Sequence, residues 1–230
     1  MKALLLLLLA LTSCTALVAQ KNTFVTVKAG TNIMDVLSKA DVVYYPDFTN
    51  GVILFRDGTA TQAKLNYNRL FDEMHFISPK GDTLALANEK NIRYVAIAND
   101  TFYYDQGYVR LLSADDGVKL VKKQVWIISD TRQVGAYNST SNSASISSYT
   151  SYNEGGRLYD LVVNEDIILK KVDQFYFGDV NNHFVLATKK NLLLLFPKEQ
   201  QRIELFLKEN KISFSNQDDL EKIVHFLKPG

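Results

Sequence analysis

Short runs in which apolar and polar residues alternate make up most of this chain, and such runs predict β-strands. The clearest example is residues 61–67, where Leu65 and Tyr67 lie on one face while Lys64 and Asn66 lie on the other. A strand of this kind buries one face against a core and exposes the other to water. We therefore expect a sheet with one solvated face in this part of the chain.

Turn-forming residues separate the predicted strands. Asp57-Gly58 predicts a tight hairpin, because glycine accepts the positive φ that a two-residue turn needs, and residues 79–82 (PKGD) predict another. Turns recur about every 8 to 12 residues as far as residue 128, with no long helical pattern between them. This spacing predicts a mainly β fold, an antiparallel meander with a sandwich or barrel-like form, rather than a parallel α/β sheet.

Individual strands are predicted at residues 41–45, 51–56, 118–121 and 125–128. The second of these is apolar enough to be covered on both faces. Residues 137–153 contain mostly serine, threonine and asparagine, a composition that predicts a mobile loop within the β-rich part.

The apolar period becomes helical near the C-terminus. Leu220 and Ile223 lie on one face of a helix that Ser215 is predicted to cap. This apolar face must be buried, and the sheet offers the surface for it. We therefore expect a β-rich domain at residues 20–186 and a small α-helical C-terminal segment at residues 187–230 that packs on the sheet, α+β overall.

Residues 1–19 have the composition of a secretory signal peptide, with Lys2, an apolar run and small residues before Gln20. The apolar run is shorter than the roughly 20 residues that cross a membrane, and no later stretch reaches that length, so no transmembrane span is predicted. Cleavage after Ala19 gives a periplasmic or secreted protein. Cleavage before Cys14 gives an outer-membrane lipoprotein acylated at that cysteine, and the sequence leaves both routes open.

The net charge and the single cysteine argue against two kinds of function, nucleic-acid binding and disulfide chemistry. The formal net charge is +1, which lacks the basic excess that phosphate neutralisation needs, so no nucleic-acid partner is predicted. Cys14 is the only cysteine, and no pair is left to form a disulfide.

Catalytic and metal-binding patterns are weak. His75, His183 and His225 lie in separate predicted elements without metal-ligand spacing, and His75 is expected on the solvated face of its strand. Neighbouring carboxylates such as Asp72 and Glu73 point to opposite faces of a strand, so they do not form a catalytic pair by themselves. We predict no catalytic, metal-binding or cofactor-binding residue and no cofactor.

Tyrosines offer the best candidate for a contact surface. Tyr44, Tyr45, Tyr103 and Tyr104 place rings on both faces of their predicted strands. Turned outward, such rings give a protein or a sugar a large contact area at low entropic cost. Turned inward, they pack across strands and under the C-terminal helices.

Several short sequences resemble uncharacterised exported proteins of Bacteroidota-type bacteria. They are FRDG at 55–58, GDTL at 81–84, DTFYY at 100–104, LFP at 195–197 and FLKENKI at 206–212. The resemblance covers much of the chain after the leader. It implies a location in the cell envelope and brings no known activity.

These features predict an exported envelope protein that is a non-catalytic binding or structural module acting through protein or glycan contacts. Two alternatives stay open. One is a glycan hydrolase that uses two carboxylates, and the other is a barrel that carries a small apolar ligand.

Overall fold

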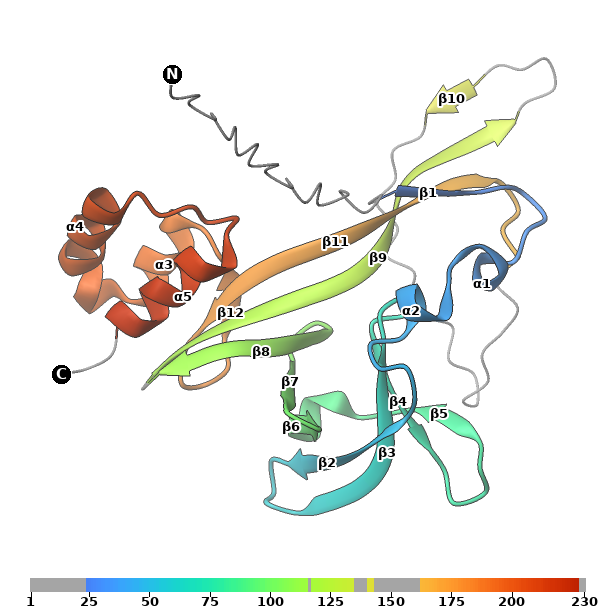
Figure 1. Cartoon of the computed structure of the whole chain (residues 1–230), viewed down its shortest axis with the longest axis horizontal. Coiled ribbons are helices and arrows are strands. Elements are labelled where there is room, and N and C mark those ends of the chain that lie inside the picture. Colours follow the sequence, from blue (N-terminus) through green and yellow to red (C-terminus); the bar gives the residue numbers. More distant parts are fainter. Residues whose placement is uncertain (1–23, 116, 135–139, 143–161, 228–230) are drawn as a thin grey trace, which may run out of the picture.

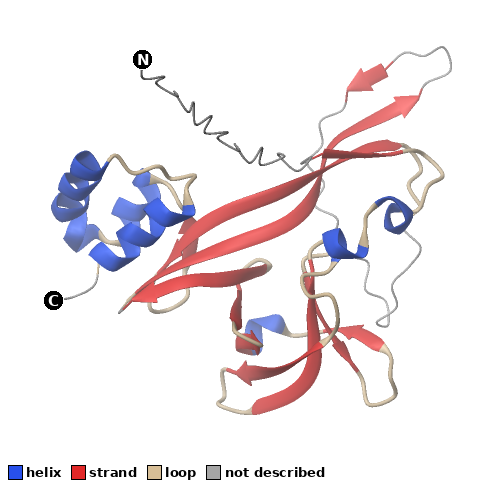
Figure 2. Cartoon of the chain, viewed as in Figure 1, coloured by secondary structure: helices blue, strands red, loops and turns tan. Residues whose placement is uncertain are grey.

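The computed structural model describes residues 24–115, 117–134, 140–142 and 162–227. One antiparallel sheet dominates it, with the strand order β1-β11-β9-β8-β7-β6-β2-β3-β4-β5, β10 beside β9 and β12 beside β11 (Figure 1). The predicted fold class is confirmed: the chain is mainly antiparallel β with a small helical part at its C-terminus, and the sheet does not close (Figure 2). The predicted leader, with Cys14, lies outside the described residues. Of the predicted loop at 137–153, only β10 lies within them.

The strands are β1 (Phe24–Val27), β2 (Thr49–Phe55), β3 (Ala60–Asn68), β4 (Glu73–Ile77), β5 (Thr83–Ala85), β6 (Ile92–Ile97), β7 (Asp100–Tyr104), β8 (Tyr108–Asp115), β9 (Val118–Val134), β10 (Thr140–Asn142), β11 (Asp166–Gly178) and β12 (Phe184–Leu186). The helices are α1 (Ile33–Val36), α2 (Lys39–Val42), α3 (Lys189–Leu195), α4 (Gln200–Asn210) and α5 (Gln217–Phe226), with short 3₁₀ turns η1 (Glu89–Asn91) and η2 (Pro197–Glu199).

Strands β9 and β11 form the spine of the molecule. All 13 residues of β11 pair with β9, which continues unbroken through the two stretches predicted as separate strands. Polar residues 122–124 lie between those stretches. Lys123 Nζ lies 2.8 Å from Asp72 Oδ2, Lys122 Nζ lies 3.3 Å from Asp173 Oδ2, and the Gln124 amide donates to Asp173 Oδ1 at 2.9 Å. The polar interruption in the sequence therefore does not interrupt the strand.

The rest of the sheet curls back toward the spine. The curl brings Arg69, just after β3, to β9, where the Trp126 N–H donates to the Arg69 carbonyl at 3.0 Å. Strands β2, β3, β6 and β7 enclose a core within this curl. Its fully buried apolar residues are Ile53, Leu65, Tyr67, Met74, Ile92, Val95, Ile97, Phe102 and Tyr108.

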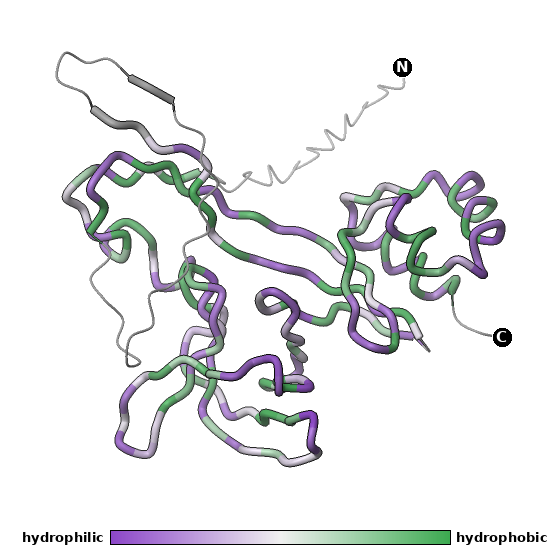
Figure 3. Tube along the Cα trace, turned by 180° about the vertical axis from the view of Figure 1, so that it is seen from behind, coloured by the Kyte–Doolittle hydropathy of each residue, from purple (hydrophilic) through white to green (hydrophobic). Residues whose placement is uncertain are grey.

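One face of the spine carries two further cores at its opposite ends. At one end, Leu120 and Phe177 pack under the C-terminal helices, and at the other Trp126 and Leu169 pack beside α1 and α2. Helix α5 contains both hydrophobic and hydrophilic residues, and the hydrophobic ones recur at the spacing of one helical face (Figure 3). The polar residues 122–124 lie between the two cores, which are thus separate.

Helix α5 begins one residue later than predicted. The side chain of Asn216, not Ser215, accepts the capping hydrogen bond, from the Asp219 N–H at 3.0 Å. Leu220, Ile223 and Val224 are completely buried, so the predicted apolar face does dock.

The strand predicted at residues 41–45 is wrong. The chain forms α2 instead and makes only a single bridge at Val43. The Trp126 indole N–H donates to the Asp41 carbonyl at 3.0 Å, and Arg69 donates to the carbonyls of Ala40 and Val43. These long-range hydrogen bonds outweigh the local β-propensity.

Three predictions of exposure are also wrong. His75 and Asn66 are buried, at 5% and 2% exposure, because the curl of the sheet covers their strands. The His75 Nε2 lies 3.0 Å from a Glu73 carboxylate oxygen, and the Asn66 amide bonds both backbone polar groups of Tyr45. Conversely, β2 is not covered on both faces, since only Ile53 in it is fully buried.

Candidate functional site

Tyr44 and Tyr45 are half-buried against the core of the curled sheet. The Tyr45 hydroxyl donates to Asp100 Oδ2 at 2.6 Å, and burial followed by this hydrogen bond raises the pKa of the phenol. The ring of Tyr44 lies between the guanidinium groups of Arg69 and Arg110, 5.7 and 5.6 Å from its centroid. Both side chains therefore pack against other residues of the protein.

Tyr103 and Tyr104 point to opposite faces of β7. Tyr104 packs edge-on against Tyr108 at 5.2 Å on the core side. Tyr103 lies on the outer face, with its ring centroid 5.7 Å from that of Phe184 and 6.5 Å from that of Tyr94. The four predicted residues therefore do not share a surface, and Tyr103 alone lies on the outer side of the curled sheet.

Tyr103 lines a surface hollow of about 390 Å³. The hollow lies between the outer face of β6, β7 and β9 and the turn that joins β11 to β12. Its lining residues are Arg56, Arg93, Tyr94, Tyr103, Lys119, Val180, Asn181 and Asn182. We call this the basic hollow.

A β-bulge brings two consecutive residues of β6 into the basic hollow. Against β2, Tyr94 pairs with Leu54 and Ile92 pairs with Phe55, which leaves Arg93 without a partner in the ladder. Neighbouring residues on a regular strand point to opposite faces, whereas a bulge re-aims the extra side chain. The bulge therefore lets Arg93 and Tyr94 line the same surface.

The cations of the basic hollow are close to its rings. Lys119 Nζ lies 5.8 Å from the ring centroid of Tyr103 and donates to the Asp179 carbonyl at 3.0 Å. Burial lowers the pKa of Lys119, and the charge of Asp179 partly opposes this shift. Burial and the nearby Tyr94 raise the pKa of Tyr103, while Arg93 lowers it. Positive charge and an aromatic face thus occupy one small volume.

The turn that overhangs the basic hollow is held by its own hydrogen bonds. Asp179 Oδ1 accepts from the backbone N–H groups of Asn181 and His183, each at 2.9 Å, and the Asp179 N–H donates to the His183 carbonyl at 3.3 Å. Asn182 adopts the left-handed conformation, with φ of 62°. The Lys119 hydrogen bond joins this turn to β9, so contacts within the protein hold the rim of the hollow in place.

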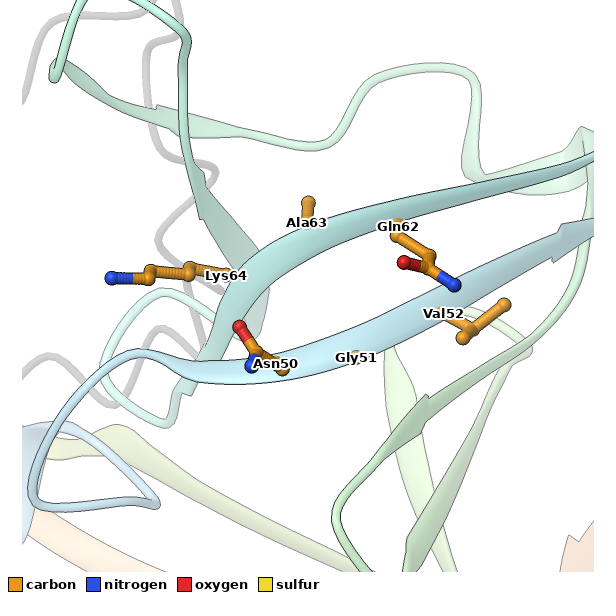
Figure 4. A pocket seen from close by; sticks show the side chains of 6 residues that line it. All are labelled: Asn50, Gly51, Val52, Gln62, Ala63 and Lys64. Atoms are coloured by element: carbon orange, nitrogen blue, oxygen red, sulfur yellow. The ribbon is translucent and has the colours of Figure 1, made fainter.

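Two other hollows have plainer linings. One of about 420 Å³ lies over the β2–β3 hairpin, where Asn50 faces Lys64 and Val52 lies beside Gln62 (Figure 4). Another, of about 630 Å³, lies beside the Asp57 turn and the chain before β6. Neither of these two hollows is lined by a tyrosine.

The carboxylates that are neighbours in the sequence do not converge. Asp72 pairs with Lys123, whereas Glu73 pairs with His75. Asp219 pairs with Lys222 at 2.7 Å. Among the described residues, no group of three or more His, Cys, Asp or Glu side chains is arranged to hold a metal ion.

Within the same part of the chain, no helix has the length and apolar character that crossing a membrane takes. Comparison with models of protein families, with curated protein sequences and with solved structures gives no match to this chain.

Sequence reasoning found one member of the basic hollow, Tyr103, and missed the rest. The alternation of apolar and polar residues in β6 does not reveal the bulge at Arg93. Lys119 pairs with Ala114, whereas Tyr103 pairs with Val109, so strand pairing alone does not place the two residues together. The long Lys119 side chain brings its Nζ to 5.8 Å from the centre of the Tyr103 ring. Tyr103 lies in the DTFYY segment at 100–104, and Arg56 lies in the FRDG segment at 55–58.

Proposed function

We propose that the chain is an exported, envelope-associated binding module that contacts a glycan or protein partner through the basic hollow. The observation that carries this proposal is the convergence of Tyr94 and Tyr103 with Arg93 and Lys119 on a rigid sheet surface. Tyrosine and arginine are the residues that dominate binding energy at contact sites, and pre-formed sites lose least entropy on binding.

The alternatives have less support. The core of the curled sheet is filled by side chains, with Tyr67 5.6 Å from Phe102 and 6.0 Å from Tyr108 between ring centroids, which weighs against a cavity for an apolar ligand. Asp72 forms an ion pair with Lys123 while Glu73 contacts His75, and these separate partners weigh against a hydrolase built on the two carboxylates.

Location is tested in the native host. Cell fractionation combined with a radiolabelled lipid precursor asks whether the chain leaves the cytoplasm and whether Cys14 is acylated. Recovery of the full-length, unlabelled chain in the cytoplasm would remove the exported part of the proposal.

Binding at the basic hollow is tested with the purified chain on a glycan array and against native envelope proteins. Tyr94→Ala removes the half-buried ring, and Val52→Ala, in the hollow of Figure 4, is the matched control. We expect Tyr94→Ala to abolish the interaction and Val52→Ala to preserve it. If both variants bind every partner as the parent does, the basic hollow is not the contact site.

A further inference from the structure

The cations of the basic hollow differ from three half-buried cations elsewhere in the sheet in their lack of an acidic partner. Lys122, Lys123 and Arg110 each lie within 3.3 Å of a carboxylate oxygen. Arg93 and Lys119, in contrast, form no ion pair with any described residue.

Arg56, the third cation, resembles these two. Its Nε donates to the Lys90 carbonyl at 2.9 Å, and within the described part of the chain it meets no carboxylate at ion-pair distance. Asp179, in the turn that overhangs the hollow, accepts two backbone N–H groups through Oδ1, and its charge partly offsets that of Lys119. The basic hollow therefore holds positive charge that the fold itself does not neutralise.

Uncompensated charge beside a fixed surface attracts an anion. Guanidinium groups bind planar or tetrahedral oxyanions through directed hydrogen bonds, and such charge-assisted bonds are stronger than neutral ones. Arg93 is exposed and forms no hydrogen bond within the described residues, so its donors are available. Lys119 has three donors, and one of them is used by Asp179.

The remaining lining favours a sugar over a peptide as the carrier of that anion. The Tyr94 ring is half-buried and offers an apolar face, and Asn181 and Asn182 add amide groups on the opposite rim. A pyranose ring presents an apolar C–H face and hydroxyls that both donate and accept, which matches an aromatic ring next to amides. A volume of about 390 Å³ is in the range of sites for small ligands.

We infer that the basic hollow binds an acidic saccharide, whose sugar ring lies on Tyr94 while its carboxylate or sulfate is held by Arg93 and Lys119. This inference rests on the proposed function, because it names the ligand class of the same site. Carboxylate and sulfate groups share the chemistry that the cations recognise, so the experiment separates them.

The test measures binding of defined probes to the full exported chain by calorimetry. The probes are an oligogalacturonate hexasaccharide, a chondroitin sulfate hexasaccharide, neutral maltohexaose and a hexaglutamate peptide. We expect at least one acidic saccharide to bind, with maltohexaose and hexaglutamate at least about tenfold weaker, and the stronger acidic probe identifies the oxyanion.

Arg93→Gln removes one cation from an exposed side chain without touching the core. It should weaken the acidic saccharide about tenfold or more, since a hydrogen bond to a charged group is lost. Lys64→Gln makes the same change of charge on β3, outside the basic hollow, and should change the affinity by less than about twofold. Raising NaCl from about 0.05 M to about 0.5 M should weaken binding to the parent and have less effect on Arg93→Gln.

Each contrary result has one meaning. If neither acidic saccharide binds, or hexaglutamate binds as tightly, or Arg93→Gln has no effect, the inference is wrong. A partner that still depends on Tyr94 would then leave the proposed function standing. Equal melting temperatures of Arg93→Gln and the parent exclude misfolding as the cause of a lost signal.

Discussion

The Lys123 ammonium lies 2.8 Å from Oδ2 of Asp72, which joins the turn between β3 and β4 to the spine strand β9. The other carboxylate oxygen accepts from the Tyr67 hydroxyl at 2.8 Å and from the Tyr108 backbone N–H at 3.0 Å. Asp72 itself has a left-handed conformation, with φ of 57°. One carboxylate thus connects three parts of the curled sheet.

Asp72→Ala should lower the free energy of unfolding by about 3 kcal/mol, because it removes the carboxylate from the Lys123 ammonium and the buried Tyr67 hydroxyl. These two donors then keep only the backbone carbonyls of Gln106 and Gln124 as acceptors. Urea denaturation measures this. The control is Asp47→Ala, which removes an ion pair with Lys39 between exposed side chains and should cost less than about 1 kcal/mol. Equal losses in the two variants would contradict the role given to Asp72.

Gly51→Ala should destabilise the sheet because strands pack too closely there for a methyl group. A Cβ at this position would lie 2.5 Å from the Ala96 carbonyl oxygen and 2.8 Å from a methyl carbon of Leu65. We expect a loss of about 2 to 3 kcal/mol, measured by thermal and urea unfolding.

Gly58→Ala provides the comparison for Gly51. No atom lies within 4 Å of a Cβ there, but φ is +89°, so only backbone strain of about 1 to 2 kcal/mol is expected. A neutral Gly51→Ala variant would show that β2 and β6 move apart easily.

Stability should fall at alkaline pH because buried tyrosines resist ionisation. Burial, and then the negative charge of a nearby acid, raises the pKa of Tyr67 and of Tyr108 above the ordinary value of 10.0. The unfolded chain releases these protons near pH 10 and the folded chain does not. The stabilising contribution is therefore complete below pH 10 and is lost as the pH rises above it.

Urea titrations between about pH 8 and pH 11 measure this effect, and the slope should reach about 1.4 kcal/mol per pH unit for each such tyrosine. Tyrosinate absorbance should rise together with unfolding rather than before it. A stability that stays constant through this range would contradict the burial of these hydroxyls.

Substitutions in the buried face of α5 should destabilise the protein as much as substitutions elsewhere in the core. Ile223→Ala empties a site that is completely buried against the spine, and we expect a loss of about 3 to 4 kcal/mol. Leu205→Ala on α4, where the side chain is 58% exposed, should change stability by less than about 0.5 kcal/mol. Hydrogen exchange at β9 residues 118–120 would report whether the helices protect that end of the spine.

Local signals in the sequence predicted much of the fold. The predicted hairpin at Asp57-Gly58 joins β2 to β3, and Gly58 has the positive φ that the turn requires. The apolar face of α5 was also predicted. These features depend on conformational preferences of a few neighbouring residues.

Features that depend on partners distant in the sequence were not predicted. Residues 41–42 became helical because Arg69 and Trp126 bind the carbonyls in and around that helix. β9 continues through its polar residues because Asp72 and Asp173 neutralise them. For the same reason the sequence predicted only part of the candidate site. A β-bulge turns the Arg93 side chain toward the basic hollow, and the sequence of β6 alone does not predict that bulge.

The length of the spine separates β1 from the basic hollow. Phe24 pairs with Lys170, while the turn that overhangs the basic hollow follows Gly178 at the other end of β11. At a rise of about 3.3 Å per residue, the two points lie roughly 25 Å apart. A small ligand bound in the basic hollow would therefore not touch β1.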